Sequence, residues 1–171
     1  MTTIAYKDGL IAVDSRETFG DQGHEHCHPC QKLFYVVLPE VGTFAIATAG
    51  ESVPGLLFVD KFRRIWSEDS LEKLREEFAG ADFEALVLHD PPGAHLSGEP
   101  EVYWFDKWLR CTPVEDLECF AIGSGAKVAL GAMKAGASAQ RAVEIATTID
   151  PYTQYPVVVG DPRGVRARIL P

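Results

Sequence analysis

The chain has 171 residues, of which 46% are hydrophobic and 24% are charged, the ordinary balance of a globular protein. Its formal net charge of −9 argues against nucleic-acid binding, because that function requires clustered Lys and Arg. No apolar run reaches the roughly 20 residues that span a bilayer, and no signal-peptide pattern is visible, so we expect one cytoplasmic domain over residues 1–171 that binds no membrane.

The first fifty residues predict four short strands and one loop. Segments 2–6 and 10–14 are short and β-rich, and the sequence KDG between them is typical of a hairpin turn. Residues 15–31 are polar and rich in Gly and His, which predicts a loop. Segments 32–39 and 42–50 are apolar at nearly every position, as expected for strands that are covered on both faces of a sheet.

In the middle of the chain, the spacing of the apolar residues changes from that of strands to that of helices. Apolar side chains recur at helical spacing over residues 51–66, and a second short helix is predicted over residues 70–78. Residues 83–89, 101–106 and 107–111 then have the composition of strands. We therefore expect a pair of helices followed by a second group of strands.

The last fifty residues repeat this order. After FAIGSG (120–125) come two helices rich in small residues, 126–136 and 137–149, and residues 155–170 form a hairpin around the sequence DPRG. Hairpin-linked strands favour antiparallel sheets, and paired helices favour covering layers. The whole order predicts an α+β fold, a four-layer αββα sandwich with two antiparallel sheets. An α+β fold with a single sheet is the competing architecture.

The second residue suggests a reaction. A threonine hydroxyl is a poor nucleophile unless a base lies next to it. If Met1 is removed, Thr2 carries a hydroxyl and a free α-amine, and the amine, with a pKa of about 7.7–8.0, can accept the hydroxyl proton. Because many unrelated proteins also begin with MTT, other stretches of the chain must decide whether this chemistry applies.

Five further stretches, taken in order, carry a resemblance. They are TTIAYKDGLIAVDSR (2–16), QKLF (31–34), ATAGES (47–52), AIGSGAKVALGAM (121–133) and TTIDPYTQ (147–154). On these stretches the chain resembles the proteasome β-subunit and HslV family of N-terminal-nucleophile (Ntn) hydrolases, in a compact bacterial or prophage-type version. The resemblance covers essentially the whole chain.

The resemblance implies a reaction centre built on four residues. Thr2 would be the nucleophile and its α-amine the base, and the backbone N–H of Gly50 would face the oxyanion. Lys32 would lie beside the Thr2 hydroxyl, where a positive charge favours the ionised form. Asp14 would pair with Lys32 and fix its position. From the residues alone, Asp14 also fits a turn and Lys32 also fits the solvated edge of a strand.

The resemblance also implies a supporting group. Ser124 would hydrogen-bond the Thr2 amine, with Asp150 and Thr153 behind it. Ser124 equally fits a helix N-cap, and Asp150 equally fits the end of a helix before a proline. Thr48 would contribute to the pocket for the residue ahead of the cleaved bond.

The sequence GHEHCHPC (23–30) offers a second kind of chemistry. It brings together side chains that bind zinc: His24, His26, Cys27, His28 and Cys30. No second Cys/His pair lies elsewhere, and a redox CxxC would require a helix behind it, whereas a strand is predicted. A metal site, a peptide-contacting loop and a plain polar loop therefore all remain open. We assign no metal and no cofactor to the reaction.

These inferences combine into one functional expectation. The chain would be a threonine endopeptidase or amidohydrolase that acts through an acyl-enzyme on peptides or unfolded proteins. The resemblance implies a homo-oligomeric ring that encloses the sites, with an ATPase unfoldase as a further partner. Two alternatives stay open: a catalytically inactive shell or assembly protein that retains the fold, and a metal-binding regulatory domain built around the His/Cys loop.

Overall fold

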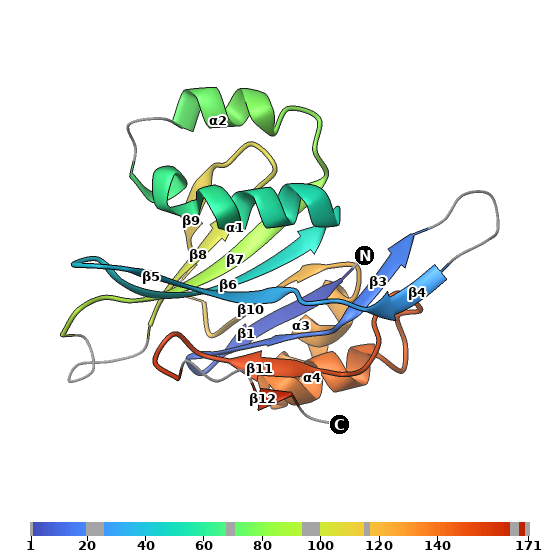
Figure 1. Cartoon of the computed structure of the whole chain (residues 1–171). Coiled ribbons are helices and arrows are strands. Elements are labelled where there is room, and N and C mark those ends of the chain that lie inside the picture. Colours follow the sequence, from blue (N-terminus) through green and yellow to red (C-terminus); the bar gives the residue numbers. More distant parts are fainter. Residues whose placement is uncertain are drawn as a thin grey trace.

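The strands form two large antiparallel sheets, each covered by helices on its outer face (Figure 1). The computed structural model describes residues 2–19, 26–67, 71–93, 100–114, 117–164 and 168–169. Within them, no helix is long and apolar enough to cross a membrane. The predicted four-layer αββα architecture is confirmed, and the single-sheet alternative is wrong.

The first sheet has the strand order β10-β1-β2-β11-β12. Its strands are β1 (Thr3–Lys7), β2 (Leu10–Val13), β10 (Cys119–Gly123), β11 (Val158–Gly160) and β12 (Arg168–Ile169). β1 pairs with β2 through the predicted KDG turn, and on its other side it pairs with β10, so that Thr3 lies opposite Gly123. This pairing brings the start of the chain next to the turn that precedes the third helix.

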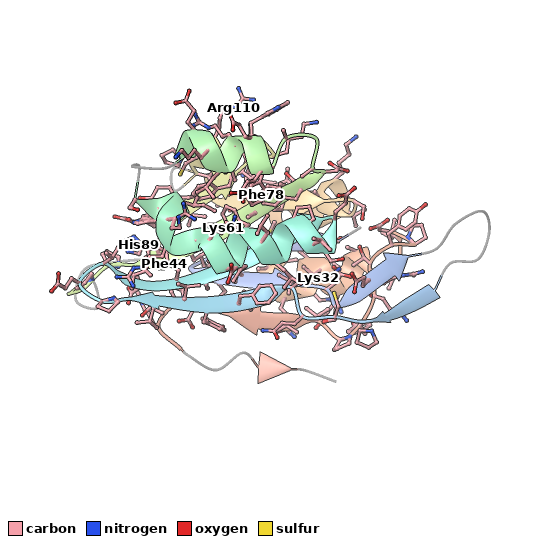
Figure 2. The ribbon with its side chains drawn as sticks, turned by 45° about the horizontal axis from the view of Figure 1, so that its top comes forward. Lys32, Phe44, Lys61, Phe78, His89 and Arg110 are labelled. Carbon is pink, nitrogen blue, oxygen red and sulfur yellow. The ribbon has the colours of Figure 1, made fainter. Side chains whose placement is uncertain are left out.

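The second sheet has the order β5-β6-β7-β8-β9. Its strands are β5 (Leu33–Leu38), β6 (Gly42–Gly50), β7 (Phe83–Asp90), β8 (Glu101–Phe105) and β9 (Cys111–Pro113). Phe44 and His89 stack at one end of this sheet, with ring centroids 4.3 Å apart, whereas Lys32 lies at the opposite end (Figure 2).

Four helices in the described residues form the outer layers: α1 (Ser52–Trp66) and α2 (Leu71–Glu77) on the second sheet, α3 (Ala126–Lys134) and α4 (Ala139–Ala146) on the first (Figure 1). Along each strand, successive side chains point alternately toward the other sheet and toward the covering helices. Ile4 and Tyr6 of β1 face the other sheet, for example, while Ala5 faces the helices. Both faces are therefore apolar, which explains the nearly continuous apolar runs in the sequence.

Three buried clusters correspond to the three spaces between the layers. The cluster between the sheets is aliphatic and includes Ile4, Ile11, Val13, Leu86 and Leu88. The cluster under α1 and α2 is aromatic and includes Phe44, Phe58, Phe62, Phe78, Phe83 and Phe105. The cluster against α3 and α4 consists mostly of small residues and includes Ala5, Ala12, Ala129, Ala139 and Ala142.

Two sequence-based predictions are wrong. Residues 15–31 contain a two-stranded hairpin, β3 (Arg16–Phe19) paired with β4 (His26–Pro29), instead of only a loop. The hairpin projects from the sandwich (Figure 1), so its polar sequence carries no apolar alternation that could reveal it. Residues 107–110 form a turn rather than part of a strand over 107–111, because Asp106 accepts hydrogen bonds from the Trp108 and Arg110 backbone, and β9 begins at Cys111.

Candidate functional site

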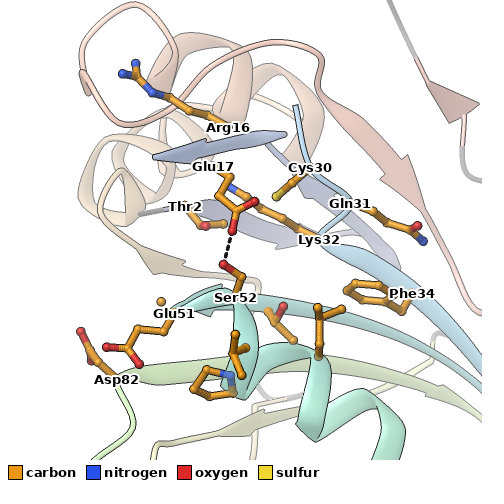
Figure 3. Close-up of a pocket in the computed structure, with 15 residues that line it drawn as sticks. Thr2, Arg16, Glu17, Cys30, Gln31, Lys32, Phe34, Glu51, Ser52 and Asp82 are labelled. Carbon is orange, nitrogen blue, oxygen red and sulfur yellow. Dashed lines mark hydrogen bonds between the residues drawn. The ribbon is translucent and has the colours of Figure 1, made fainter. Parts of the chain in front are cut away.

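Thr2 lies immediately before β1 and is buried, with 3% of its surface exposed. It sits where two pockets meet. One pocket, of about 730 Å³, is lined by Lys32 and Thr48 among others and is called the Lys32 pocket below (Figure 3). The other, of about 520 Å³, is lined by Trp104 and Trp108 among others and is called the Trp108 pocket. Three residues line both: Thr2, Gly50 and Asp82.

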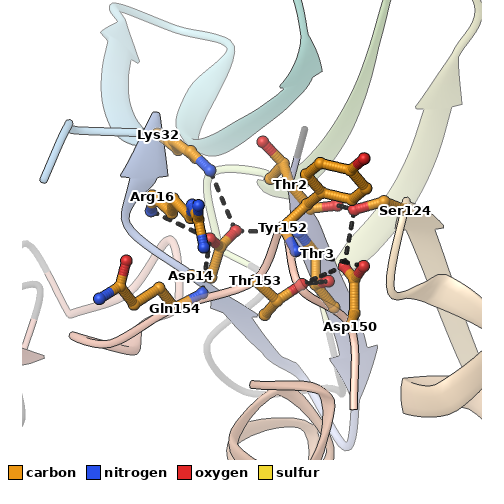
Figure 4. A network of polar contacts seen from close by, with 10 residues as sticks. All are labelled: Thr2, Thr3, Asp14, Arg16, Lys32, Ser124, Asp150, Tyr152, Thr153 and Gln154. Atoms are coloured by element: carbon orange, nitrogen blue, oxygen red, sulfur yellow. Dashed lines mark hydrogen bonds and ion pairs between the residues drawn. The ribbon is translucent and has the colours of Figure 1, made fainter. Parts of the chain in front are cut away.

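Asp14 is fully buried at the end of β2 and holds Lys32 in place. Its Oδ1 accepts hydrogen bonds from Lys32 Nζ at 3.0 Å and from the Thr3 backbone N–H at 2.9 Å. Its Oδ2 accepts from the backbone N–H groups of Arg16 at 3.0 Å and Gln154 at 3.3 Å (Figure 4). A carboxylate offers about four acceptor positions, and all are used here. The ion pair that the sequence predicted is therefore present and has one defined geometry.

Lys32 directs its ammonium group toward the start of the chain. Its side chain is 7% exposed. Figure 4 shows its ammonium group at Asp14, on the side that faces Thr2, and Figure 3 shows the side chain extending toward Thr2. A cation in this place stabilises negative charge on a nearby oxygen.

A second polar group lies on the other side of Thr2. Ser124 Oγ donates to Asp150 Oδ2 at 2.7 Å, and Thr153 Oγ1 donates to the same oxygen at 2.5 Å. The hydroxyls of Thr153 and Thr3 are also 2.5 Å apart (Figure 4). The sequence predicted that Ser124, Asp150 and Thr153 act together, and the structure brings them together; Thr3 is a member that sequence reasoning missed.

Ser124 contacts Thr2 through a different atom from the one expected. Its backbone N–H donates to the Thr2 carbonyl oxygen at 2.8 Å, and its Oγ lies 3.3 Å from the same oxygen. A hydrogen bond to the Thr2 amine was predicted, but the Thr2 nitrogen is still an amide joined to Met1 in this sequence. The carbonyl contact fixes the backbone of Thr2 whether or not that bond is cut.

The two glycines that flank Ser124 permit this close approach. A Cβ at Gly123, where φ is +88°, would collide with the Thr2 carbonyl group. A Cβ at Gly125 would collide with the Thr3 hydroxyl and lie only 3.0 Å from Thr153 Oγ1. Both positions therefore require glycine. The sequence signal for these two contacts is the GSG segment, in which a glycine stands on each side of Ser124.

Solved structures of other proteins share this arrangement of layers. The Gly-1 mutant of Anbu from Hyphomicrobium sp. strain MC1 has a TM-score of 0.71 and 13% identity, over 93% of this chain and 80% of that chain. HslV from Trypanosoma brucei has a TM-score of 0.65 and 19% identity, over 93% and 97%. Anbu from Pseudomonas aeruginosa, described as a helical assembly, has a TM-score of 0.67 and 13% identity, over 94% and 80%.

This chain has a proteasome-like Ntn-hydrolase fold. The identities are low, so the likeness concerns the fold. No protein-family model and no curated protein sequence matches the chain.

Within this Ntn fold, the remaining predicted residues lie around the same two pockets. Gly50 is the last residue of β6 and lines both pockets, as Thr2 does. Thr48, two residues earlier, lines the Lys32 pocket but not the Trp108 pocket. The Thr48 N–H donates to the Lys32 carbonyl at 3.1 Å, which ties β6 to the start of β5. Figure 4 shows six of the predicted site residues together, namely Thr2, Asp14, Lys32, Ser124, Asp150 and Thr153, and Gly50 lines both pockets with Thr2.

Cys30 is the described thiol of the His/Cys loop, and it lines the Lys32 pocket. Burial raises the pKa of its thiol despite the nearby Lys32 charge, which disfavours the thiolate that acts as a nucleophile. Among the described residues, no group of three or more His, Cys, Asp or Glu side chains is placed to hold a metal ion. His24 and the side chains of His26, Cys27 and His28 lie outside the described part, so the three alternatives for this loop stay open.

Proposed function

We propose that this chain is a threonine-type peptidase or amidohydrolase of the proteasome-like class, active once the peptide bond before Thr2 has been cut. The observation that carries the proposal is the position of Thr2 where two pockets meet, beside the Lys32 ammonium that the buried Asp14 holds. A nucleophile at the junction of two pockets can reach a peptide bond whose two halves extend in opposite directions.

The proposed reaction begins at the Thr2 hydroxyl. Its proton passes to the freed Thr2 α-amine, and Oγ1 attacks the substrate carbonyl carbon. The negative charge that develops on the carbonyl oxygen is stabilised by the backbone N–H of Gly50. The ammonium then gives its proton to the leaving nitrogen, the C–N bond breaks, and a Thr2 ester remains. A water molecule, deprotonated by the same amine, hydrolyses that ester.

The supporting residues have distinct tasks in this scheme. Lys32 stabilises the deprotonated Thr2 oxygen, and Asp14 positions Lys32. Ser124 fixes the Thr2 backbone and would become a hydrogen-bonding partner of the new amine, while Asp150 and Thr153 orient the Ser124 hydroxyl. We assign Thr3 to this group as well, because its hydroxyl contacts Thr153.

The proposed setting is a homo-oligomer that encloses the sites and receives peptides or unfolded proteins. The P. aeruginosa Anbu structure, which has the same fold, is itself described as a helical assembly. Enclosure would keep a nucleophile of this kind away from folded proteins.

The test is mass spectrometry of the purified native protein with a threonine-directed probe. We expect a mass that corresponds to a chain beginning at Thr2, and one added epoxyketone or vinyl-sulfone probe per chain. Thr2→Ser should retain labelling, whereas the isosteric Thr2→Val should reduce its rate at least ~100-fold, because it removes the attacking oxygen. Thr112→Val, at an exposed position of β9, is the matched control and should label like the native protein.

A retained residue before Thr2, together with the absence of labelling, would refute the peptidase and favour the inactive shell. A metal-sized adduct in the native spectrum would favour the metal-binding alternative. The same native spectrum reports the number of subunits, and a strictly monomeric species would contradict the proposed setting.

A further inference from the structure

The Trp108 pocket meets the Lys32 pocket at Thr2, and Thr48 lines only the latter. Because both pockets share Thr2 and Gly50, a peptide bond held over Thr2 extends one half of the substrate into each. Thr48 lines the Lys32 pocket, which takes the acyl half in the proposed reaction. The Trp108 pocket is then left for the half that departs as an amine.

A tight turn builds the outer wall of this pocket. Asp106 Oδ1 accepts hydrogen bonds from the backbone N–H groups of Trp108 at 2.9 Å and Arg110 at 3.0 Å, and its Oδ2 accepts from Arg110 Nε at 2.8 Å. Leu109 is buried and adopts a φ of +55°. The neighbouring Trp108 points outward, and 55% of its surface is exposed. The backbone of Trp108 is thus held by Asp106, and its indole faces solvent.

Positive charge gathers around this indole. Lys107 Nζ lies 4.8 Å from the centroid of the Trp108 ring, and Arg110 Cζ lies 4.7 Å from it. Arg75 of α2 lines an adjoining hollow together with Trp108 and Arg110, and Figure 2 places Arg110 beside α2. Lys107 and Arg110 therefore line the Trp108 pocket next to this indole, and Arg75 lines the adjoining hollow.

The nearby carboxylates make few ion pairs with these cations. Both oxygens of Asp106 are taken by the turn itself, and both oxygens of Glu84 are taken by Gly123 and Trp104. Asp82 lies at the Thr2 end, where it lines both pockets. Within the described residues, Lys107 has no carboxylate partner, and Arg110 pairs with Asp106 through Nε alone. The Lys107 ammonium and the terminal nitrogens of Arg110 can therefore donate hydrogen bonds to a bound group at this end of the pocket.

We propose that the Trp108 pocket binds the leaving half of the substrate, and that Lys107 and Arg110 bind a carboxylate on that half. The carboxylate is either the free C-terminus of a short peptide or an Asp or Glu side chain. Guanidinium and ammonium groups form their strongest hydrogen bonds with carboxylates, and the Trp108 ring supplies a flat apolar contact beside them. This inference rests on the proposed peptidase function.

The test compares matched peptides that differ only in the leaving half. One pair ends in a free carboxylate or an amide, and a second pair, amidated at the end, carries Asp or Asn at the same position. We expect kcat/KM to be about fivefold to tenfold higher for the charged member of at least one pair. Which pair responds identifies the source of the carboxylate. Lys107→Met should abolish the preference and Lys107→Glu should invert it, whereas Lys127→Glu, an equal charge change on α3, should leave it unchanged.

A binding measurement separates this inference from the proposed function. Leaving-half peptides are titrated onto the full-length Thr2→Val protein, and tryptophan fluorescence reports occupancy. Preference for the carboxylate form that is lost in a Thr2→Val, Lys107→Met double variant supports the pocket even if no peptide is ever cleaved. Equal affinity for acid and amide forms, or cleavage without any dependence on this charge, would overturn the inference while leaving the peptidase proposal standing.

Discussion

Glu84 links the two sheets beside Thr2. It belongs to β7, yet its Oε1 accepts from the Gly123 N–H of the other sheet at 3.1 Å, and its Oε2 accepts from Trp104 Nε1 at 3.1 Å. Gly123 is followed by Ser124, whose N–H holds the Thr2 carbonyl. Glu84 therefore acts on Thr2 indirectly. It holds the Gly123–Ser124 backbone, and the Ser124 N–H in turn binds the Thr2 carbonyl.

The substitution Glu84→Gln tests this link. A Gln side chain keeps the shape of Glu but turns an NH₂ group toward either the Gly123 N–H or Trp104 Nε1. That hydrogen bond is then lost, and the N–H group remains unpaired. We expect a loss of about 1–3 kcal/mol in the free energy of unfolding, measured by urea denaturation. If Thr2 is labelled as proposed, the labelling rate of the folded protein should also fall.

The matched control for this test is Glu72→Gln at an exposed position of α2, which should change the free energy of unfolding by no more than about 0.5 kcal/mol. An unchanged stability for Glu84→Gln would mean that Gly123 is held by its strand pairing alone.

The turn over residues 106–110 makes the stability depend on pH. Burial acts to raise the pKa of Asp106, but hydrogen bonds from the Arg110 and Trp108 backbone and from the Arg110 guanidinium outweigh it, so the pKa lies below its ordinary value. Because the folded pKa is the lower one, the carboxylate stabilises the fold above the ordinary titration range of Asp, near pH 4. That contribution is lost as the pH falls through the folded pKa.

We therefore expect Asp106→Asn to be less stable than the native chain by about 1–2 kcal/mol at pH 7, and the difference to shrink below pH ~3. Denaturation curves at several pH values measure this directly. Asp60→Asn, on an exposed part of α1, should show no such trend. A difference that is constant with pH would show that the Asp106 carboxylate is not the source.

The same turn shows why some elements were not predictable. KWLRC has the composition of a strand, and only the hydrogen bonds of Asp106 with residues two and four positions later make it a turn. The hairpin of β3 and β4 was missed for the opposite reason, since polar strands outside the sandwich carry no periodic signal. Strands such as β1, β6 and β7 were predictable because both of their faces are buried.

The candidate site also contains residues that the sequence analysis found and residues that it missed. Asp14, Lys32 and Ser124 could be chosen only through the family resemblance. Composition does not encode the long-range contacts that join Lys32 to Asp14 and Ser124 to the Thr2 carbonyl. Glu84 was missed, although a lone carboxylate inside the apolar segment FEALVLH was a signal for a buried polar contact. Its partners lie 20 and 39 residues away along the chain and could not be named.

The two helix layers are packed with side chains of different size, and this affects the site. Aromatic rings fill the space beneath α1 and α2, whereas alanines separate α3 and α4 from the first sheet. Small residues let α4 lie close to both β1 and β2. Thr2 precedes β1 and Asp14 follows β2, so the depth of the alanine layer sets the positions of both residues.

Enlarging this layer should therefore disturb the site from a distance. Ala142 of α4 is fully buried, and Ala142→Leu forces extra volume against β1 and β2, which we expect to cost about 1–3 kcal/mol in the free energy of unfolding. The shift of these strands should also slow probe labelling at Thr2, measured per folded molecule. Phe62→Leu, in the opposite layer, lowers stability at a place remote from both strands and should leave that rate unchanged. If both variants label at the native rate, the position of Thr2 is fixed locally by Asp14 and Ser124 and does not depend on the spacing of the layers.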